Sequence, residues 1–432
     1  MFTADTLTAL GKIAVVFAFI LLGIARKWGL WPPILAGAGL MGFLCGFSPL
    51  AVGAIFAQAC VQPRFLAMAG VVAFILLLSE VQAYSGQGRR LVNGLEPYMR
   101  SPRLRLIFFP ALIGLLPMPG GAIFSCPMVR DIAEGTTLSS EDKGIINYWF
   151  RHIWEVTWPL CPGYILACAF ADIPISVLWR YTWPLAPASL CIGFFLFLRA
   201  PVAFAPGQAP RSAVKKPLPA VLADAMPIVA AIAGAPVFGL IFDMLHSNNL
   251  APEVPFITSL LAAAAIALAQ TKTPLSVVPR LLFTQHVMQM LMILFAIFAF
   301  KDVIIATKIT EMFSPAVSSR AALLGLTLFL SLLCGLLTGL MAGFVGTAFP
   351  LLLALLLQMG LYEDRLPWVV LALVAGNLGQ MASPVHTCLL VTVDFFQCVF
   401  SSFWRRVLKA TALQGVAALC YVALLWLSGA KL

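Results

Sequence analysis

The stretch LLPMPGGAIFSCPM, residues 115–128, decides the fold because it places poor helix formers inside a segment apolar enough to lie in a membrane. Two prolines bracket a methionine, a Gly-Gly pair follows, and a third proline comes soon after. Proline removes a backbone hydrogen-bond donor, and glycine weakens the helical turn that remains. Since lipid offers no replacement hydrogen bonds, this stretch predicts backbone that is buried in protein or lines a cavity.

The composition is that of a polytopic membrane protein. Of the 432 residues, 61% are hydrophobic and 10% are charged, whereas soluble proteins carry about 25% charged residues. The mean hydropathy is +0.98. The formal net charge is +10, but the basic residues stand in short loops between apolar runs, where they set orientation in the membrane. We therefore expect the lipid bilayer as a partner and no nucleic acid.

Motifs for metal binding or catalysis are missing from the sequence. The ten cysteines lie mostly inside apolar runs, without a C-x-x-C pair or a histidine at metal-ligand spacing, so we interpret them as free thiols. The segment HIWEV contains H-x-x-E without the second histidine of the zinc-protease motifs. No G-x-S-x-G frame surrounds Ser125, and no G-x-x-x-x-G-K-[ST] phosphate loop occurs. We expect neither an enzyme, nor an ATP-driven pump, nor a bound cofactor or metal.

Apolar runs divide the chain into two similar halves. A polar linker rich in proline, alanine and basic residues separates an N-terminal membrane repeat, 1–204, from a C-terminal repeat, 220–432, and itself covers 205–219. The runs long enough to enter a bilayer lie near 9–25, 30–58, 65–84, 107–129, 146–170 and 176–199, and near 220–244, 252–270, 282–303, 321–358, 367–392 and 407–428.

A single offset of 222 residues aligns the helix-breaking and polar positions of the two halves. It places Gly121 on Gly343 (343 − 121 = 222) and Glu155 on Asn377 (377 − 155 = 222). It also aligns Ser125 with a threonine and a proline of one half with a proline of the other. This pattern predicts an internal duplication, which is common in transporters.

The basic loops predict how the halves lie in the membrane. The loop 87–105, the linker and the loop around 405–409 carry an excess of Lys and Arg and should be cytoplasmic, whereas HSNNLAPE and YEDRLP should be external. These assignments agree only if the fourth run of each half enters the membrane and returns to its own side. We therefore predict an all-α polytopic protein of two inverted repeats, each with about five transmembrane helices, one re-entrant hairpin and a broken helix. A proline-kinked crossing helix is the alternative.

The hairpin tips are predicted at PMPGG and AGFVG. Helix ends at such tips leave N–H and C=O groups that can bind ions and carboxylates. The predicted binding residues at the two tips are Gly120, Gly121, Ser125, Gly343, Gly346 and Thr347.

The fifth run of the first half holds ionisable residues in an apolar helix. Arg151 and Glu155 are spaced i, i+4, with His152 between them and Thr157 and Pro162 following. Ionisable groups inside a span face a cavity or a partner by default, and Glu155 lies deepest. We expect Glu155, Thr157 and Pro162 to contribute to a substrate or ion site; the alternative is that Arg151, His152 and Glu155 only anchor the helix at the interface.

The equivalent run of the second half, GNLGQMASPVHTC, combines Asn377 with a break at Ser383 and Pro384, followed by His386 and Thr387. Amide, hydroxyl and freed carbonyl oxygens together suit a hard cation or a carboxylate. Histidine titrates near neutral pH and could bind substrate or move a proton. We add these five residues to the predicted site, with a purely structural histidine as the alternative for His386.

The stretches LLPMPGGAIFSCPMV, GFVGTAFPLL and ASPVHTCLLVT resemble those of a family of prokaryotic integral membrane proteins known as domain of unknown function 401. The resemblance covers essentially the whole chain. The family is grouped with the ion transporter superfamily, which includes permeases for dicarboxylates, citrate and gluconate and also cation/proton antiporters. The resemblance implies paired re-entrant hairpins, broken helices, a homodimer with scaffold and transport domains, and elevator-like movement.

The hairpin tips depart from the pattern of sodium-coupled dicarboxylate members, which resemble one another in a Ser-Asn-Thr sequence at each tip. Here the tips read Gly120-Gly121-Ala122 and Gly343 to Thr347, and Glu155 favours protons over sodium as the coupling ion. The expected function is that of a secondary active transporter for a small organic anion in the plasma (inner) membrane of a bacterium or archaeon. The alternative is a cation/proton antiporter that uses Glu155 and Asn377 without an organic substrate, and a third class is a membrane scaffold or channel.

Overall fold

The computed structural model describes residues 4–99, 101–115, 121–199, 202–203, 217–245, 253–309 and 319–429, and all regular structure within these ranges is helical. In chain order the α-helices are α1 (Ala4–Ala25), α2 (Trp31–Leu44), α3 (Pro49–Val61), α4 (Pro63–Ser85), α5 (Gln87–Leu95), α6 (Pro102–Leu115), α7 (Gly121–Ile132), α8 (Ser140–His152), α9 (Pro162–Ala171), α10 (Ile175–Thr182), α11 (Leu185–Phe197), α12 (Leu218–Met244), α13 (Val254–Thr271), α14 (Val278–Leu282), α15 (Gln285–Thr307), α17 (Arg320–Thr338), α18 (Met341–Gln358), α19 (Arg365–Ala382), α20 (Thr387–Phe396) and α21 (Phe400–Leu427).

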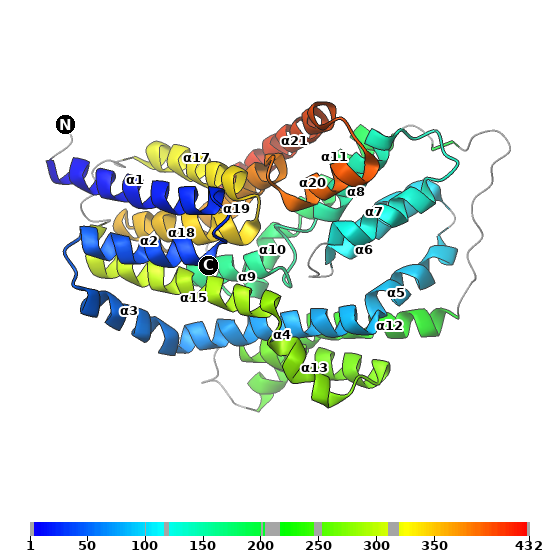
Figure 1. Ribbon diagram of the computed structural model, residues 1–432, viewed down its shortest axis with the longest axis horizontal. Coiled ribbons are helices and arrows are strands. Elements are labelled where there is room, and N and C mark those ends of the chain that lie inside the picture. The colour runs from blue at the N-terminus through cyan, green and yellow to red at the C-terminus, as the bar shows by residue number, and fades with distance from the viewer. Residues whose placement is uncertain are drawn as a thin grey trace.

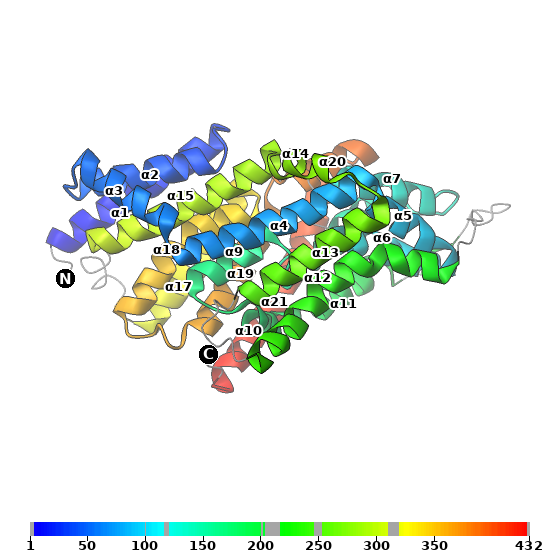
Figure 2. The same cartoon turned by 90° about the horizontal axis from the view of Figure 1, so that it is seen from below.

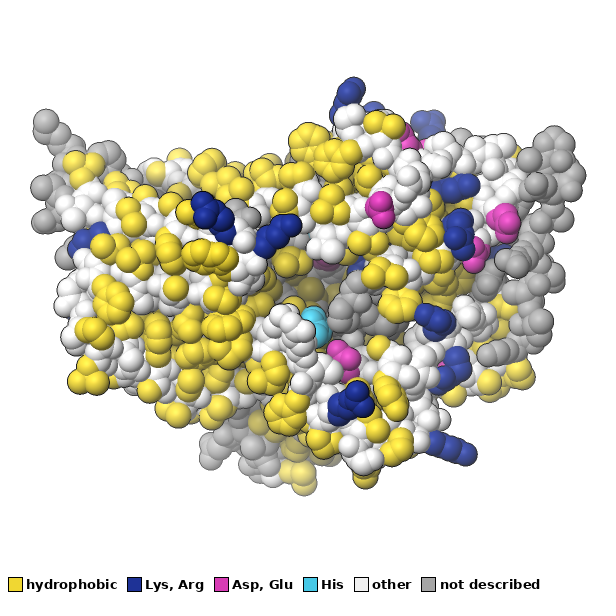
Figure 3. Space-filling model, in the orientation of Figure 1, with side chains coloured by type: hydrophobic (Ala, Val, Ile, Leu, Met, Phe, Trp, Pro, Cys, Tyr) yellow, Lys and Arg dark blue, Asp and Glu magenta, His cyan; other side chains and the backbone are white. Residues whose placement is uncertain are grey.

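Helix length and composition confirm a multi-pass membrane protein. Within the described ranges, nine apolar segments are long enough to cross a bilayer, and one further pair, Pro162–Ala171 with Ile175–Phe197, is bent by 112°. On the face in Figure 3, hydrophobic side chains cover much of one end, whereas many Lys and Arg side chains gather toward the end that holds α5 and α6. These helices contain or adjoin the basic loop predicted to face the cytoplasm.

The interior of the protein is formed by helices that are apolar on all sides. In Figure 1, α1, α2, α15, α17 and α18 lie at one end and α5 to α8 at the other, with α4 extending between them. Figure 2 shows α12 and α13 side by side along one edge. Within the apolar segment of each helix, 83% of α18 is buried inside the protein, but only 11% of α12. A helix that is hydrophobic all round and buried is typical of a membrane-protein interior, while α12 is suited to lipid contact.

Local sequence explains where several helices begin and end. Pro63 and Pro162 occupy the first turns of α4 and α9, where proline removes a hydrogen bond that the helix does not need. Thr284 caps α15 by accepting from the amide of Val287. Gly339 ends α17 in the left-handed conformation, at φ +62°, which glycine adopts without strain.

The two helices of the first predicted hairpin are short, and their re-entrant path stays a prediction. Helices α6 and α7 contain 14 and 12 residues, so each is about 18–21 Å long and too short to cross a core of about 30 Å. Most of the predicted tip, including Gly120, falls in 116–120 and lies outside the described residues.

The tip predicted for the second hairpin was wrong. AGFVG is helical and belongs to the first two turns of α18; the turn lies earlier, at Gly339 and Leu340. Helices α17 and α18, with 19 and 18 residues, are each long enough to cross the membrane, so a re-entrant path for this pair stays a prediction. Glycines are tolerated inside α18 because neighbouring side chains occupy the space beside them: a Cβ on Gly343 would lie 2.6 Å from Thr338, and one on Gly346 would lie 2.7 Å from Ile297.

Candidate functional site

Two helix breaks position the candidate site. The first separates α8, ending at His152, from α9, beginning at Pro162; the second separates α19, ending at Ala382, from α20, beginning at Thr387. The sequence therefore located both breaks, although Asn377 lies within α19 and not in the break itself. Proline at both breaks prevents the helix from continuing.

Each break is hydrogen-bonded to the last turn of a helix in its own half of the chain. The indole Nε1 of Trp158 donates to the carbonyl oxygen of Leu115, the last residue of α6, at 2.7 Å. The hydroxyl of Ser383 donates to the carbonyl oxygen of Leu336, in the last turn of α17, at 2.6 Å. These bonds satisfy carbonyls that a helix end leaves without an internal partner, and they fix the breaks against these helices.

The carboxylate of Glu155, in the first break, contacts the second half of the chain. Asn377 donates to its Oε2 at 3.0 Å, and Gln380 donates to Oε1 and Oε2 at 3.1 and 3.0 Å. Asn377 and Gln380 are each only 2% exposed, whereas the Glu155 side chain is 22% exposed. The arrangement can hold a negative charge with neutral amide donors, so Glu155 keeps a site for a positive partner.

A pair of histidines lies beside this carboxylate. The Nε2 atoms of His152 and His386 are 3.1 Å apart, and His152 Nε2 is 3.8 Å from Glu155 Oε1. The Nδ1 atoms face the backbone carbonyls of Tyr148 and Gly339, each at 2.5 Å. Both rings are therefore oriented by the backbone, which makes them fixed parts of the site.

Arg151 extends from α8 toward the start of α7. A Cβ on Gly121 would lie 2.6 Å from Arg151 Nη2 and 2.9 Å from Nε, so the lack of a side chain at Gly121 leaves room for the guanidinium. Arg151 Nη1 lies 2.7 Å from the sulfur of Cys388. Buried Arg151 Nε and Ser125 Oγ have no hydrogen-bond partner within the part of the chain that the structure describes.

The other predicted residues make local backbone contacts, begin a helix or lie exposed. Thr157 donates to the carbonyl oxygen of Trp154 at 3.1 Å, and Thr347 to that of Gly343 at 2.8 Å, so both hydroxyls are engaged within their own segments. Pro162 is the first residue of α9. Pro384 and Thr387 are exposed in and after the second break.

Sequence reasoning missed two residues of the cluster, Gln380 and Cys388. Gln380 follows Asn377 by three positions, so both lie on one face of α19, a spacing that could have identified it. Cys388 follows His386 by two positions, but its proximity to Arg151 joins residues 237 positions apart and needs the fold.

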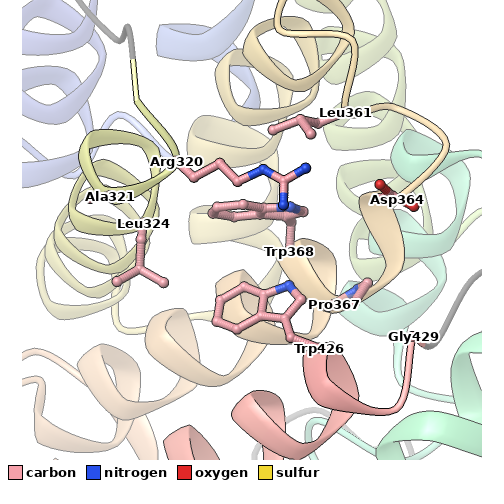
Figure 4. A pocket seen from close by; sticks show the side chains of 9 residues that line it. All are labelled: Arg320, Ala321, Leu324, Leu361, Asp364, Pro367, Trp368, Trp426 and Gly429. Carbon is pink, nitrogen blue, oxygen red and sulfur yellow. The ribbon is translucent and has the colours of Figure 1, made fainter.

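Two cavities are lined by residues of the first helix break or of α7. One of about 550 Å³ is lined by Trp158, Pro159 and Leu160 of the first break together with residues of α12 and α13. Another, of about 610 Å³, lies between α7 and the α4–α5 segment, with Phe124 and Arg89 on its wall. A third cavity, of about 400 Å³, is surrounded by Arg320, Trp368 and Trp426 at the ends of α17, α19 and α21 (Figure 4). None of the predicted site residues that the structure describes lines this cavity or the other two.

Comparison with known proteins identifies the fold and the family. The structure is similar to the crystal structure of the YdaH transporter of Alcanivorax borkumensis, described as having an unusual topology, with a TM-score of 0.59 and 10% sequence identity over 89% of this chain and 90% of that chain. No curated protein matches the sequence. The model of a family of proteins of unknown function, DUF401, matches residues 35–427, and the chain therefore belongs to the DUF401 family.

Proposed function

We propose that this protein is a secondary active transporter that moves a small organic anion, such as a carboxylate, across the plasma membrane of a bacterium or archaeon. A proton or cation gradient drives the movement, and the protein works as a homodimer by alternating access of the elevator type. The similarity to a transporter fold over 89% of the chain supports the general class. The polar cluster at the two helix breaks carries the proposal.

Arg151 and Ser125 supply the anion-binding part of that cluster. Arg151 Nε and Ser125 Oγ are buried and without partners among the described residues, and unpaired buried donors are costly. A carboxylate that accepts from both groups removes this cost, and arginine binds carboxylates in a fixed fork geometry. Gly121, at the start of α7, leaves the space that the guanidinium occupies, because a Cβ there would lie 2.6 Å from Arg151 Nη2.

Glu155 supplies the coupling part. Its carboxylate holds a negative charge that the amides of Asn377 and Gln380 orient but do not neutralise. A proton or a cation bound there offsets both this charge and that of the substrate anion. Anion and coupling ion thus stabilise one another's binding, which is the basis of symport.

The proposed mechanism treats the two halves as inverted repeats that move relative to each other. Helix bounds support the duplication: α4 runs from Pro63 to Ser85 and α15 from Gln285 to Thr307, so both ends differ by 222 positions (285 − 63 = 222; 307 − 85 = 222). This is the offset that relates Glu155 to Asn377. Broken helices from two repeats that meet at one site are a recurring arrangement in secondary transporters.

A cation/proton antiporter is the second candidate. One observation favours it: Gln380 Oε1 is buried without a hydrogen-bond partner in the described residues, close to the Glu155 carboxylate. Carboxylate and amide oxygens are the ligands that hard cations prefer. In this case Glu155 and Asn377 would exchange cations for protons without an organic substrate.

Thermal unfolding of the purified protein distinguishes the two. Mono-, di- and tricarboxylates and sugar acids are tested at two pH values, with and without sodium. A ligand that binds only the folded state raises Tm by mass action. At a ligand concentration of 100 times Kd, the folded state gains about 2.7 kcal/mol of stability. A rise with one class of acid supports the anion transporter, and its dependence on sodium or pH identifies the coupling ion. Rises with cations or pH alone support the antiporter.

A further inference from the structure

The two histidines of the cluster turn ring nitrogens toward each other. Each Nδ1 lies 2.5 Å from a backbone carbonyl oxygen, that of Tyr148 for His152 and that of Gly339 for His386. A carbonyl oxygen only accepts, so each Nδ1 carries a hydrogen. In the neutral rings both Nε2 atoms then present lone pairs, at a separation of 3.1 Å. Arg151 Nη1 lies 3.4 Å from His152 Nε2 and gives that nitrogen one partner, but the two acceptors still repel each other unless a proton or a metal cation lies between them.

A third ligand atom completes a metal-binding set. One ring nitrogen of His152, one of His386 and the Sγ of Cys388 all lie within 4.8 Å of one another. Glu155 Oε1 lies 3.8 Å from His152 Nε2, beside this set but outside the group of atoms that are mutually within 4.8 Å. In a tetrahedral zinc site with Zn–N distances of 2.0–2.1 Å, two nitrogen ligands are about 3.3 Å apart, close to the separation of the two histidines.

We propose that His152, His386 and Cys388, with the Glu155 carboxylate beside them, bind a divalent cation of the Zn²⁺ class. Imidazole and thiolate ligands select borderline and soft metals over Na⁺, Mg²⁺ or Ca²⁺. The bonds from Nδ1–H to backbone carbonyls are the outer contacts that orient metal-binding histidines. The ion joins the end of α8 to the start of α20, and therefore links the two helix breaks.

The local charges are compatible with this ion. A thiolate at Cys388 and a carboxylate at Glu155 together balance a divalent cation. Arg151 donates from Nη1 to the Cys388 sulfur at 2.7 Å, so the thiolate keeps a positive partner before metal binds. Both histidines are buried, at 5% and 2% exposure, and burial strengthens ligand–metal attraction by excluding water. The inference rests on these contacts and not on the proposed transport.

The test measures metal binding by the full-length protein in detergent after treatment with a chelator. Titration with Co²⁺, a spectroscopic substitute for Zn²⁺, should give one ion per chain with a thiolate-to-metal charge-transfer band. Cys388→Ser should abolish the band, and His386→Gln should weaken binding roughly 10- to 100-fold or more. Cys334→Ser, which removes another buried thiol, should leave both band and affinity unchanged.

Two measurements keep the result independent of folding defects and of transport. Zn²⁺ should raise the Tm of the wild-type protein but not that of Cys388→Ser, while the two metal-free proteins melt alike. X-ray absorption of the zinc-loaded wild type should find nitrogen and sulfur neighbours at about 2.0 and 2.3 Å. A wild-type protein that binds no Co²⁺, or a spectrum without sulfur, overturns the proposal and assigns a shared proton to the histidine pair. Neither outcome depends on whether an organic acid binds.

Discussion

Asn377 donates a hydrogen bond of 3.0 Å from its side-chain amide to the carboxylate of Glu155, and the two residues are 222 positions apart (377 − 155 = 222). The same offset aligns the two halves of the sequence, so positions that match in the predicted duplication also touch in the structure. One member is charged and the other neutral. The pair itself therefore carries one negative charge, that of the Glu155 carboxylate.

Glu155→Gln is expected to abolish coupled transport while the protein stays folded. The substitution keeps the shape of the side chain and one oxygen that can accept from Asn377 and Gln380, but it removes the charge that balances a coupling ion. Uptake into liposomes of the acid identified by thermal unfolding, with and without an ion gradient, measures the effect. Asp302→Asn is the control, because Asp302 is a half-buried carboxylate of α15 that pairs with Gln62 away from the cluster. Full gradient-dependent transport by Glu155→Gln would remove this residue from the mechanism.

Asn377→Asp is expected to lower Tm more than Asn377→Ala. Both variants lose the amide donor, and leaving a buried polar group without its partner costs about 1–3 kcal/mol. Aspartate also places a second carboxylate about 3 Å from the first, and like charges at that distance cannot both ionise without a large penalty. Thermal unfolding near neutral pH compares the two variants. Equal Tm values would mean that the Glu155 carboxylate is not held in this position.

The two helix breaks and their main polar residues could be predicted from sequence because proline, glycine and ionisable residues in an apolar run have direct local consequences. Pro162 and Pro384 mark the breaks, and the offset pairs Glu155 with Asn377. The turn between α17 and α18 could not be placed, because AGFVG is as rich in glycine as a turn yet remains helical. Whether a glycine bends a chain or admits a neighbour depends on tertiary contacts, here with Thr338 and Ile297.

Contacts between side chains that are far apart in the sequence could not be predicted either. Arg151 appears in sequence as an i, i+4 partner of Glu155, but in the structure its guanidinium lies against Gly121 and Cys388. Helix periodicity states which residues share a face and not which helix that face contacts. The metal-binding set could not be predicted for the same reason, since His152 and His386 are 234 positions apart in the sequence.

Gly335→Ala is expected to destabilise the protein by about 1–3 kcal/mol or more, since overfilling a packed contact forces the backbone to move. A Cβ at Gly335 would lie 2.0 Å from the carbonyl oxygen of Gly376, which means that α17 and α19 touch backbone to backbone at this point. Gly325→Ala, in the same helix, is the matched control because a Cβ there meets nothing within 4 Å. Thermal unfolding should place Gly325→Ala at or above the wild-type Tm. A wild-type Tm for Gly335→Ala would contradict the close approach of these helices.

Asp142→Asn is expected to lower stability by about 1 kcal/mol near neutral pH, the typical cost of losing a helix cap, and to have no effect in acid. Asp142 forms a capping box with Ser139 at the start of α8, and its Oδ1 accepts from Arg406 of α21 at 2.8 Å. Burial alone would raise the pKa of Asp142, but the hydrogen bonds from Ser139 and Arg406 outweigh burial and lower the pKa below its ordinary value of 3.8. A carboxyl group whose pKa is lower in the folded state stabilises the fold above the unfolded-state pKa, and this contribution is lost as the pH falls through the folded-state pKa. The Tm difference between wild type and Asp142→Asn should therefore be constant from neutral pH down to about pH 5 and shrink below pH 4. The control for this prediction is Asp131→Asn. Asp131 forms an exposed ion pair with its neighbour Arg130, and such pairs contribute about 0–1 kcal/mol to stability. A Tm difference that persists unchanged in acid would show that the Asp142 carboxylate is not the stabilising form.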